Sequence, residues 1–202
     1  MKQHKRLSGI ERRWFLGNVG IITLLTIACV LAVILSMAAY YDTNLRSGLE
    51  TKAKTTTDFF SNYISQSYNE YYQSCIKFAK TFEEKDRLEL QFISTSGKIV
   101  ASSYGKFAGR SPSTPEIHQA MDSQQTRVFK GRNPSTGERI LAVSSPMIYS
   151  NGEVIGVLRY VTSLRNADLQ ILMIALIAAT VGLLFIGSIF FMSSFFIKSI
   201  LV

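Results

Sequence analysis

Two long runs without a charged residue dominate the hydrophobic pattern of the chain. Residues 14–41 read WFLGNVGIITLLTIACVLAVILSMAAYY, and residues 169–197 read LQILMIALIAATVGLLFIGSIFFMSSFFI. A helix needs about 20 mainly apolar residues to cross a hydrocarbon layer about 30 Å thick. The pattern therefore predicts membrane-spanning helices over residues 14–41 and 167–197. Two buried core helices are the disfavoured alternative, because such helices are rarely so long and so uniformly apolar.

The first run also has features of a secretory signal peptide. A basic leader precedes it, and Ser36-Met37-Ala38 is similar to a small-x-small cleavage site. The apolar stretch of a signal peptide is about 7–15 residues long, however, and this run is longer. We therefore interpret residues 14–41 as an uncleaved anchor that follows a basic leader, residues 1–13.

The charges beside the two runs predict how the chain is oriented. Basic side chains stay on the cytoplasmic side of a membrane. The basic residues of the flanks are Lys2, Lys5, Arg6, Arg12, Arg13 and Lys198. We therefore expect both termini in the cytoplasm and residues 42–168 outside the cell. These flanks account for much of the formal net charge of +8, so the basic composition does not indicate a nucleic-acid partner.

The region between the two runs changes character near Phe82. In residues 42–82, apolar and aromatic side chains recur at steps of three and four. This period predicts one long amphipathic helix that continues from the first span and extends roughly 60 Å. An aromatic-rich stripe on it is interpreted as a packing face: Tyr63, Tyr68, Tyr71, Tyr72 and Phe78.

Residues 86–162 alternate between apolar and polar positions and are divided by turn sequences. Strands are predicted over 88–93, 98–102, 126–130, 139–148 and 154–162, with a short helix over 115–122. Asn133-Pro134-Ser135-Thr136-Gly137 and Asn151-Gly152 are typical turn sequences. The predicted fold is α+β: two transmembrane helices flank one outer domain, residues 42–166, with a long N-terminal helix and a five-stranded antiparallel sheet.

Three stretches of this domain resemble a known class of sensor. They are LELQFISTSGKIVASS at 88–103, GERILAVSSP at 137–146 and GEVIGVLRYVTSL at 152–164. With the order of elements, they resemble the extracytoplasmic PAS-like fold of single Cache domains in bacterial membrane-bound sensor histidine kinases. The resemblance implies a homodimer in the cell membrane that detects an extracellular stimulus.

The resemblance also implies a cytoplasmic output beyond the second span. Residues 198–202 are interpreted as the start of a truncated cytoplasmic linker. The ATP-dependent kinase, and its response regulator as partner, would belong to the missing part. A methyl-accepting chemoreceptor or another HAMP-linked receptor is the alternative, and a stand-alone membrane-anchored interaction domain is a third class.

Few residues of the chain itself have the spacing of catalytic or metal-binding groups. His4 and His118 are the two histidines, and neither has the sequence context of a phosphoacceptor. Glu116 with His118, and the acidic group at 83–86, lack the converging arrangement of a metal site. We expect no catalytic residue, metal or cofactor in this chain.

The two cysteines lie in different predicted regions. Cys29 falls in the first span and Cys75 in the outer domain, so no disulfide is expected within that domain. A half-buried free thiol is the favoured interpretation of Cys75, and a disulfide between two copies of the chain is the alternative.

A small-molecule pocket is the best candidate site. In PAS-like sensors the sheet face away from the long helix holds the ligand, closed by the loop before the third strand. That loop contains Tyr104, Lys106, Phe107 and Arg110 here. Strand alternation places Arg127 and Phe129 on one face and turns Arg159 and Tyr160 to opposite faces.

The candidate ligand-binding residues are Tyr104, Arg110, Arg127, Tyr149 and Arg159. An arginine facing an apolar pocket would favour a small anionic ligand through a bidentate contact. The alternative is that these residues are surface charges around a filled core.

Overall fold

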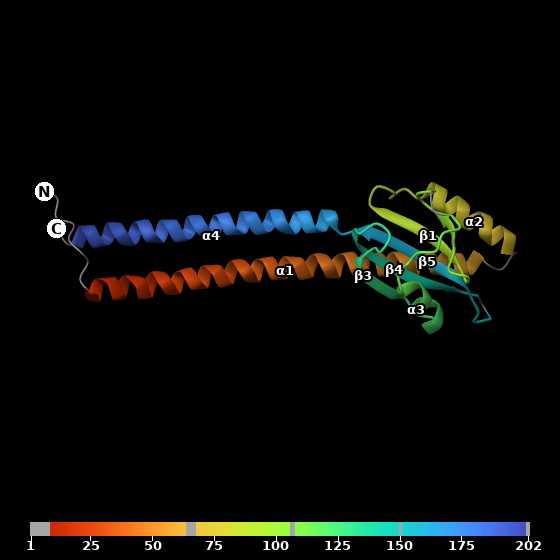
Figure 1. Cartoon of the computed structure of the whole chain (residues 1–202), viewed down its shortest axis with the longest axis horizontal. Coiled ribbons are helices and arrows are strands. Elements are labelled where there is room, and N and C mark those ends of the chain that lie inside the picture. Colours follow the sequence, from red (N-terminus) through yellow and green to blue (C-terminus); the bar gives the residue numbers. More distant parts are fainter. Residues whose placement is uncertain (1–8, 64–67, 106–107, 150, 201–202) are drawn as a thin grey trace. The chain divides into compact units, whose positions relative to one another are not determined.

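The computed structural model describes residues 9–63, 68–105, 108–149 and 151–200 (Figure 1). The chain divides into two compact units: Tyr41–Ala167, and the two segments Met1–Tyr40 and Asp168–Val202 together. The helices and strands, in chain order, are α1 (Gly9–Tyr63), α2 (Tyr68–Thr81), β1 (Leu88–Ser94), β2 (Ile99–Ser102), α3 (Glu116–Ser123), β3 (Arg127–Arg132), β4 (Arg139–Ile148), β5 (Val154–Ser163) and α4 (Arg165–Ile200).

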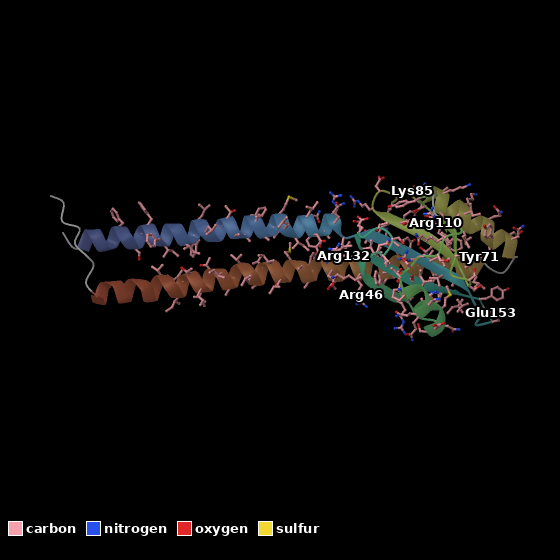
Figure 2. All side chains as sticks on the ribbon, in the orientation of Figure 1. Arg46, Tyr71, Lys85, Arg110, Arg132 and Glu153 are labelled. Carbon is pink, nitrogen blue, oxygen red and sulfur yellow. The ribbon has the colours of Figure 1, made fainter. Side chains whose placement is uncertain are left out.

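The helices α1 and α4 are each long and apolar enough to cross a membrane. Their most apolar 18-residue windows have mean hydropathies of 2.7 and 2.6, and only 0% and 6% of those windows is buried. Figure 2 shows the side chains of both helices projecting outward from the ribbons. A Cβ atom added to Gly182 would lie 3.1 Å from Val30 Cγ2, so α1 and α4 approach each other closely there. Both helices are therefore candidate membrane spans, in the regions where the sequence predicted them.

The five strands of the outer domain form one antiparallel sheet in the order β2-β1-β5-β4-β3. The predicted strands are confirmed, with ends that shift by no more than two residues. Gln91 on β1 pairs with Arg159 on β5, which pairs with Ser144 on β4, which pairs with Arg127 on β3. Since side chains alternate between faces, these four residues lie on the same face of the sheet.

The opposite face is covered by α1 and α2. Phe60 of α1 and Phe92 of β1 are both 1% exposed, and their ring centroids are 5.0 Å apart. Tyr160 of β5 is buried on the same side, where its hydroxyl lies 2.9 Å from Thr56 Oγ1. This face contains the larger of the two core clusters.

The prediction of one continuous helix over residues 42–82 is wrong. The structure has α1 ending at Tyr63 and α2 beginning at Tyr68; residues 64–67 lie outside the described part. In one straight helix Phe60 and Phe78 would be roughly 27 Å apart. Their ring centroids are 5.3 Å apart, because both rings pack into the same cluster beneath the sheet. Two helices allow Phe78 to pack against Phe60, which one straight helix would not.

Cys75, on α2, is 1% exposed and thus fully buried rather than half-buried. Burial raises the pKa of its thiol from 9.0 to about 12, although a hydrogen bond with Tyr71 acts in the opposite direction. A thiol that is buried and protonated is not available for a disulfide between two folded copies.

The other face of the sheet carries α3 and the segments around it. Ile117 of α3 packs with Ile93, Ile99 and Val157 in the second core cluster. This cluster covers one end of the face. The remainder of the face is where the candidate site lies.

Candidate functional site

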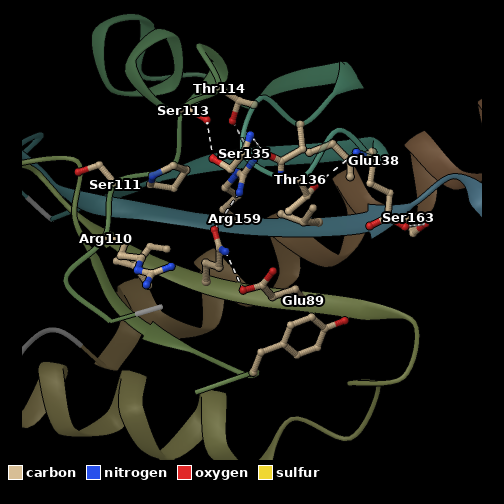
Figure 3. A pocket seen from close by; sticks show the side chains of 17 residues that line it. Glu89, Arg110, Ser111, Ser113, Thr114, Ser135, Thr136, Glu138, Arg159 and Ser163 are labelled. Atoms are coloured by element: carbon tan, nitrogen blue, oxygen red, sulfur yellow. Dashed lines mark hydrogen bonds between the residues drawn. The ribbon is translucent and has the colours of Figure 1, made fainter. Parts of the chain in front are cut away.

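A cavity of about 280 Å³ opens on the α3 face of the sheet, and its lining residues are drawn in Figure 3. The floor is formed by β1, β4 and β5, through residues such as Gln91, Ile140 and Val161. The walls come from the segment before α3, residues 110–114, and from the β3–β4 turn, residues 133–138. The two wall segments are joined at Ser113 and Ser135, whose hydroxyl oxygens are 3.3 Å apart.

Arg159 lies at the centre of the cavity floor and is 3% exposed. Its Nε donates to Glu116 Oε1 at 2.8 Å, Nη1 to Gln91 Oε1 at 2.9 Å, and Nη2 to Thr114 Oγ1 at 2.8 Å. These bonds join β5 to β1 and to the start of α3. A guanidinium that donates from all three nitrogens is held in one orientation, which suits a residue that organises a site.

Glu116 balances the charge of Arg159. It is the first residue of α3 and is 0% exposed. Its Oε1 accepts hydrogen bonds from both Arg159 and Thr114, whereas Oε2 has no hydrogen-bond partner among the described residues. The positive end of the helix dipole also favours a carboxylate in the first turn. The guanidinium of Arg159 is therefore already paired with a carboxylate of the chain itself.

A second group of charges lines the cavity beside the end of β5. Glu89 Oε1 accepts hydrogen bonds from Gln91 Nε2 at 2.7 Å and from Ser102 Oγ at 2.8 Å. Glu138 Oε1 accepts a hydrogen bond from Ser163 Oγ. The pKa of the Tyr104 hydroxyl is raised, first by burial and then by the negative charges of Glu89, Glu138 and Asp86.

Three of the five predicted ligand-binding residues line this cavity: Tyr104, Arg110 and Arg159. Figure 3 shows Thr114 on one side of Arg159, and Glu89 and Arg110 on the other.

Two of the predicted residues do not line it. Arg127 shares the sheet face with Arg159, but its Nε donates to Ser123 Oγ at the end of α3, 3.0 Å away. Tyr149 packs against the larger core cluster, on the helix-covered side. Lys106 and Phe107, from the same loop as Tyr104, lie outside the described residues.

Sequence reasoning missed the acidic members of the site, Glu89, Glu116 and Glu138. Glu89 and Gln91 are the polar positions of the alternating stretch at the start of β1, and neither was among the candidate residues. Their alternation did place both on one face. That Arg159 lies on this same face could not be predicted from sequence, because it depends on the pairing of β1 with β5.

No group of three or more His, Cys, Asp or Glu side chains within the described ranges is arranged to hold a metal ion.

Comparisons with known proteins give matches among solved structures. A scan against protein-family models finds no match, and a search of curated proteins finds none. The ligand-binding domain of the Campylobacter jejuni chemoreceptor Tlp3, in complex with L-valine, matches with a TM-score of 0.53 and 14% identity, covering 80% of this chain and 66% of that one. The extracellular domain of mmHK1S-Z2, described as a histidine kinase, matches with a TM-score of 0.51 and 12% identity, covering 71% and 63%. The Vibrio cholerae histidine kinase DctB sensor domain matches with a TM-score of 0.48 and 17% identity, covering 66% and 57%.

These matches establish the fold of the outer domain. It has the PAS-like fold of Cache sensor domains. The chain spans between 57% and 66% of the length of the three matched structures. The predicted fold class is thereby confirmed, and the outer domain resembles a chemoreceptor ligand-binding domain and a histidine kinase extracellular domain in fold.

Proposed function

We propose that this chain is the sensor module of a membrane-bound signalling protein, and that the cavity around Arg159 binds a small extracellular ligand. The observation that carries the proposal is the position of the cavity. Its lining includes Val161 and Ser163, the last part of the strand that leads into the candidate span α4.

The junction between β5 and α4 supports transmission of a signal from this cavity. A single residue, Leu164, separates the strand from the helix, and its side chain is 4% exposed. Leu164 N–H donates to the Arg139 carbonyl at 2.9 Å, and Arg165 N–H donates to Ser163 Oγ at 3.2 Å. A ligand that displaces Ser163 would therefore act on the first turn of α4. Helix shifts of about 1–2 Å are a known mode of switching.

The module is proposed to lie in a bacterial cell membrane as a homodimer, with both termini in the cytoplasm and residues 42–168 outside. The basic residues before α1 and Lys198 near the end of α4 support this orientation. The fold of the outer domain agrees with an extracytoplasmic sensor.

A cytoplasmic histidine kinase is the first candidate for the output, with a phosphorelay to a response regulator. A methyl-accepting chemoreceptor is the second candidate, because both kinds of protein are among the matched structures. The reading frame beyond Val202 distinguishes them. A phosphoacceptor histidine segment supports the kinase, and a long methyl-accepting helical hairpin supports the chemoreceptor.

Ligand binding is testable with the whole chain in lipid nanodiscs, screened by thermal shift against amino acids, organic acids, amines and sugars. We expect at least one compound to raise the melting temperature of the wild type. Val161→Phe should abolish that shift, because the larger side chain fills the cavity. Val154→Phe, on the same strand but away from the cavity, is the matched control and should keep it. A screen without any hit, or a shift that survives Val161→Phe, would contradict the proposal.

A further inference from the structure

The charges around the cavity indicate which class of ligand it can bind. Arg159 is the buried cation of the floor, and Glu116 neutralises it through a 2.8 Å ion pair. Burying a second, free anion beside an arginine that is already paired would add an uncompensated charge to a buried site. The positive charge of the floor is therefore already neutralised by Glu116, without any ligand.

The charges that remain on the walls are mainly acidic. Glu89 and Glu138 line the cavity, and the exposed Arg110 lines it as well. The cavity lining has two carboxylates and two guanidinium groups, and Glu116, which pairs with Arg159 without lining the cavity, adds a third carboxylate nearby.

Glu89 and Glu138 lie at the same end of the cavity. Glu89 pairs across strands with Val161, and Ser163 is the next residue of β5 on that face. Diagonal neighbours of this kind in an antiparallel sheet are about 7–8 Å apart. Ser163 in turn donates a hydrogen bond to Glu138. The two carboxylates thus flank the end of β5, close to the start of α4.

The hydrogen bonds of these carboxylates leave acceptor capacity. The hydrogen bonds that both side chains accept involve Oε1, and neither Oε2 makes a hydrogen bond to any residue that the structure describes. The pKa of Tyr104 is raised first by burial and then by the negative charges of Glu89, Glu138 and Asp86, which agrees with an acidic environment here. A cation that donates hydrogen bonds would satisfy both the charge and the acceptors.

We propose that the cavity selects a small ligand with a primary ammonium group, bound between Glu89 and Glu138, rather than a simple anion. This inference rests on the proposed function, because it names the class of ligand for the same cavity. It also connects ligand and helix directly. An ammonium group between the two carboxylates would contact the Glu138–Ser163 pair that precedes α4.

Calorimetry on the full chain in nanodiscs tests the charge preference with size-matched probes of opposite charge. Ethanolamine and putrescine are the amines, and glycolate and succinate are the corresponding carboxylates. We expect the amines to bind and the carboxylates not to bind over the same concentration range. Glu89→Gln and Glu138→Gln should each weaken amine binding about tenfold or more, because each loses a charge-assisted hydrogen bond. Glu153→Gln, in the β4–β5 turn (Figure 2), is the matched control and should bind as the wild type does.

The outcomes separate this inference from the proposed function. Carboxylates that bind as well as or better than amines, with binding lost in Val161→Phe, would overturn the amine preference and leave the sensor proposal standing. Amine binding that is unchanged in both glutamine variants would also overturn it. A cavity that takes no small molecule of any class would remove both proposals.

Discussion

At the scale of single residues, the ion pair between Arg159 and Glu116 is buried, whereas the described pairs of Arg46, Lys52 and Lys130 are exposed. The two side chains are 4% and 1% exposed. Such a pair need not stabilise the fold relative to apolar residues, but removing one partner leaves a buried charge unmatched. Replacing either residue alone should therefore destabilise the fold more than replacing both.

We expect Arg159→Leu to lower the free energy of unfolding by about 3–5 kcal/mol, because Glu116 would remain buried without its partner. The double variant Arg159→Leu, Glu116→Leu should recover most of that loss. Urea titration followed by near-ultraviolet circular dichroism measures both. Arg46→Leu breaks the exposed pair with Glu50 and serves as control, with an expected loss below about 1 kcal/mol. A double variant no more stable than the single one would argue against this account.

Cys75 gives the outer domain a pH-dependent stability at alkaline pH. Its thiol pKa is 9.0 when unfolded and about 12 when folded. The unfolded chain therefore loses this proton first, and the stability contributed by the protonated thiol falls as the pH rises from 9 toward 12. Urea titrations at pH 8 and pH 10 should show a smaller decrease for Cys75→Ala than for the wild type. Equal decreases in the two proteins would contradict the assignment to Cys75.

At the scale of elements, the centre of the sheet depends on a close contact at Gly156 of β5. A Cβ atom there would lie 2.5 Å from the Ile93 carbonyl oxygen and 3.1 Å from Met147 Cε. The first contact is with backbone, which has no alternative rotamer to adopt. Strand β5 therefore has no room for a side chain at this position.

Gly156→Ala is expected to destabilise the outer domain by about 1–3 kcal/mol, as overpacking does. Gly48→Ala is the matched control, since a Cβ at Gly48 in α1 meets no atom within 4 Å. That change should stabilise by up to about 1 kcal/mol, the usual difference between alanine and glycine inside a helix. Thermal melts of the two variants side by side measure the contrast. A Gly156→Ala protein as stable as the wild type would show that β5 can move away from β1.

The elements also show which parts of the fold were accessible from sequence. Strands followed local alternation and turn residues such as Asn151-Gly152, so their positions were predictable. The separation of α1 from α2 was not, because Phe60 and Phe78 each fit a helical period, and their contact is a tertiary one. The same holds for the candidate site. Strand alternation predicted the sheet face of Arg159, but its ion pair with Glu116 was not predictable, because the two residues are 43 positions apart in sequence.

At the scale of the whole molecule, the distribution of charge predicts which side of the membrane each segment occupies. In a Cys29→Ala, Cys75→Ala background, Ser135→Cys should react with a membrane-impermeant maleimide in intact cells. His4→Cys should react only after permeabilisation, because the basic leader stays in the cytoplasm. Labelling with the opposite pattern would reverse the proposed orientation.

The short junction at Leu164 also determines how α4 is rotated about its own axis relative to the end of β5. An α-helix turns by about 100° per residue, so one inserted or deleted residue at this junction would rotate every later position of α4 by that angle relative to the end of β5. Leu164 cannot absorb the change by loosening, since its side chain is in the core and its N–H is bonded to Arg139. Chain length at this junction thus determines which side chains α4 presents to its neighbours. Natural variation here should come in whole helical turns rather than single residues.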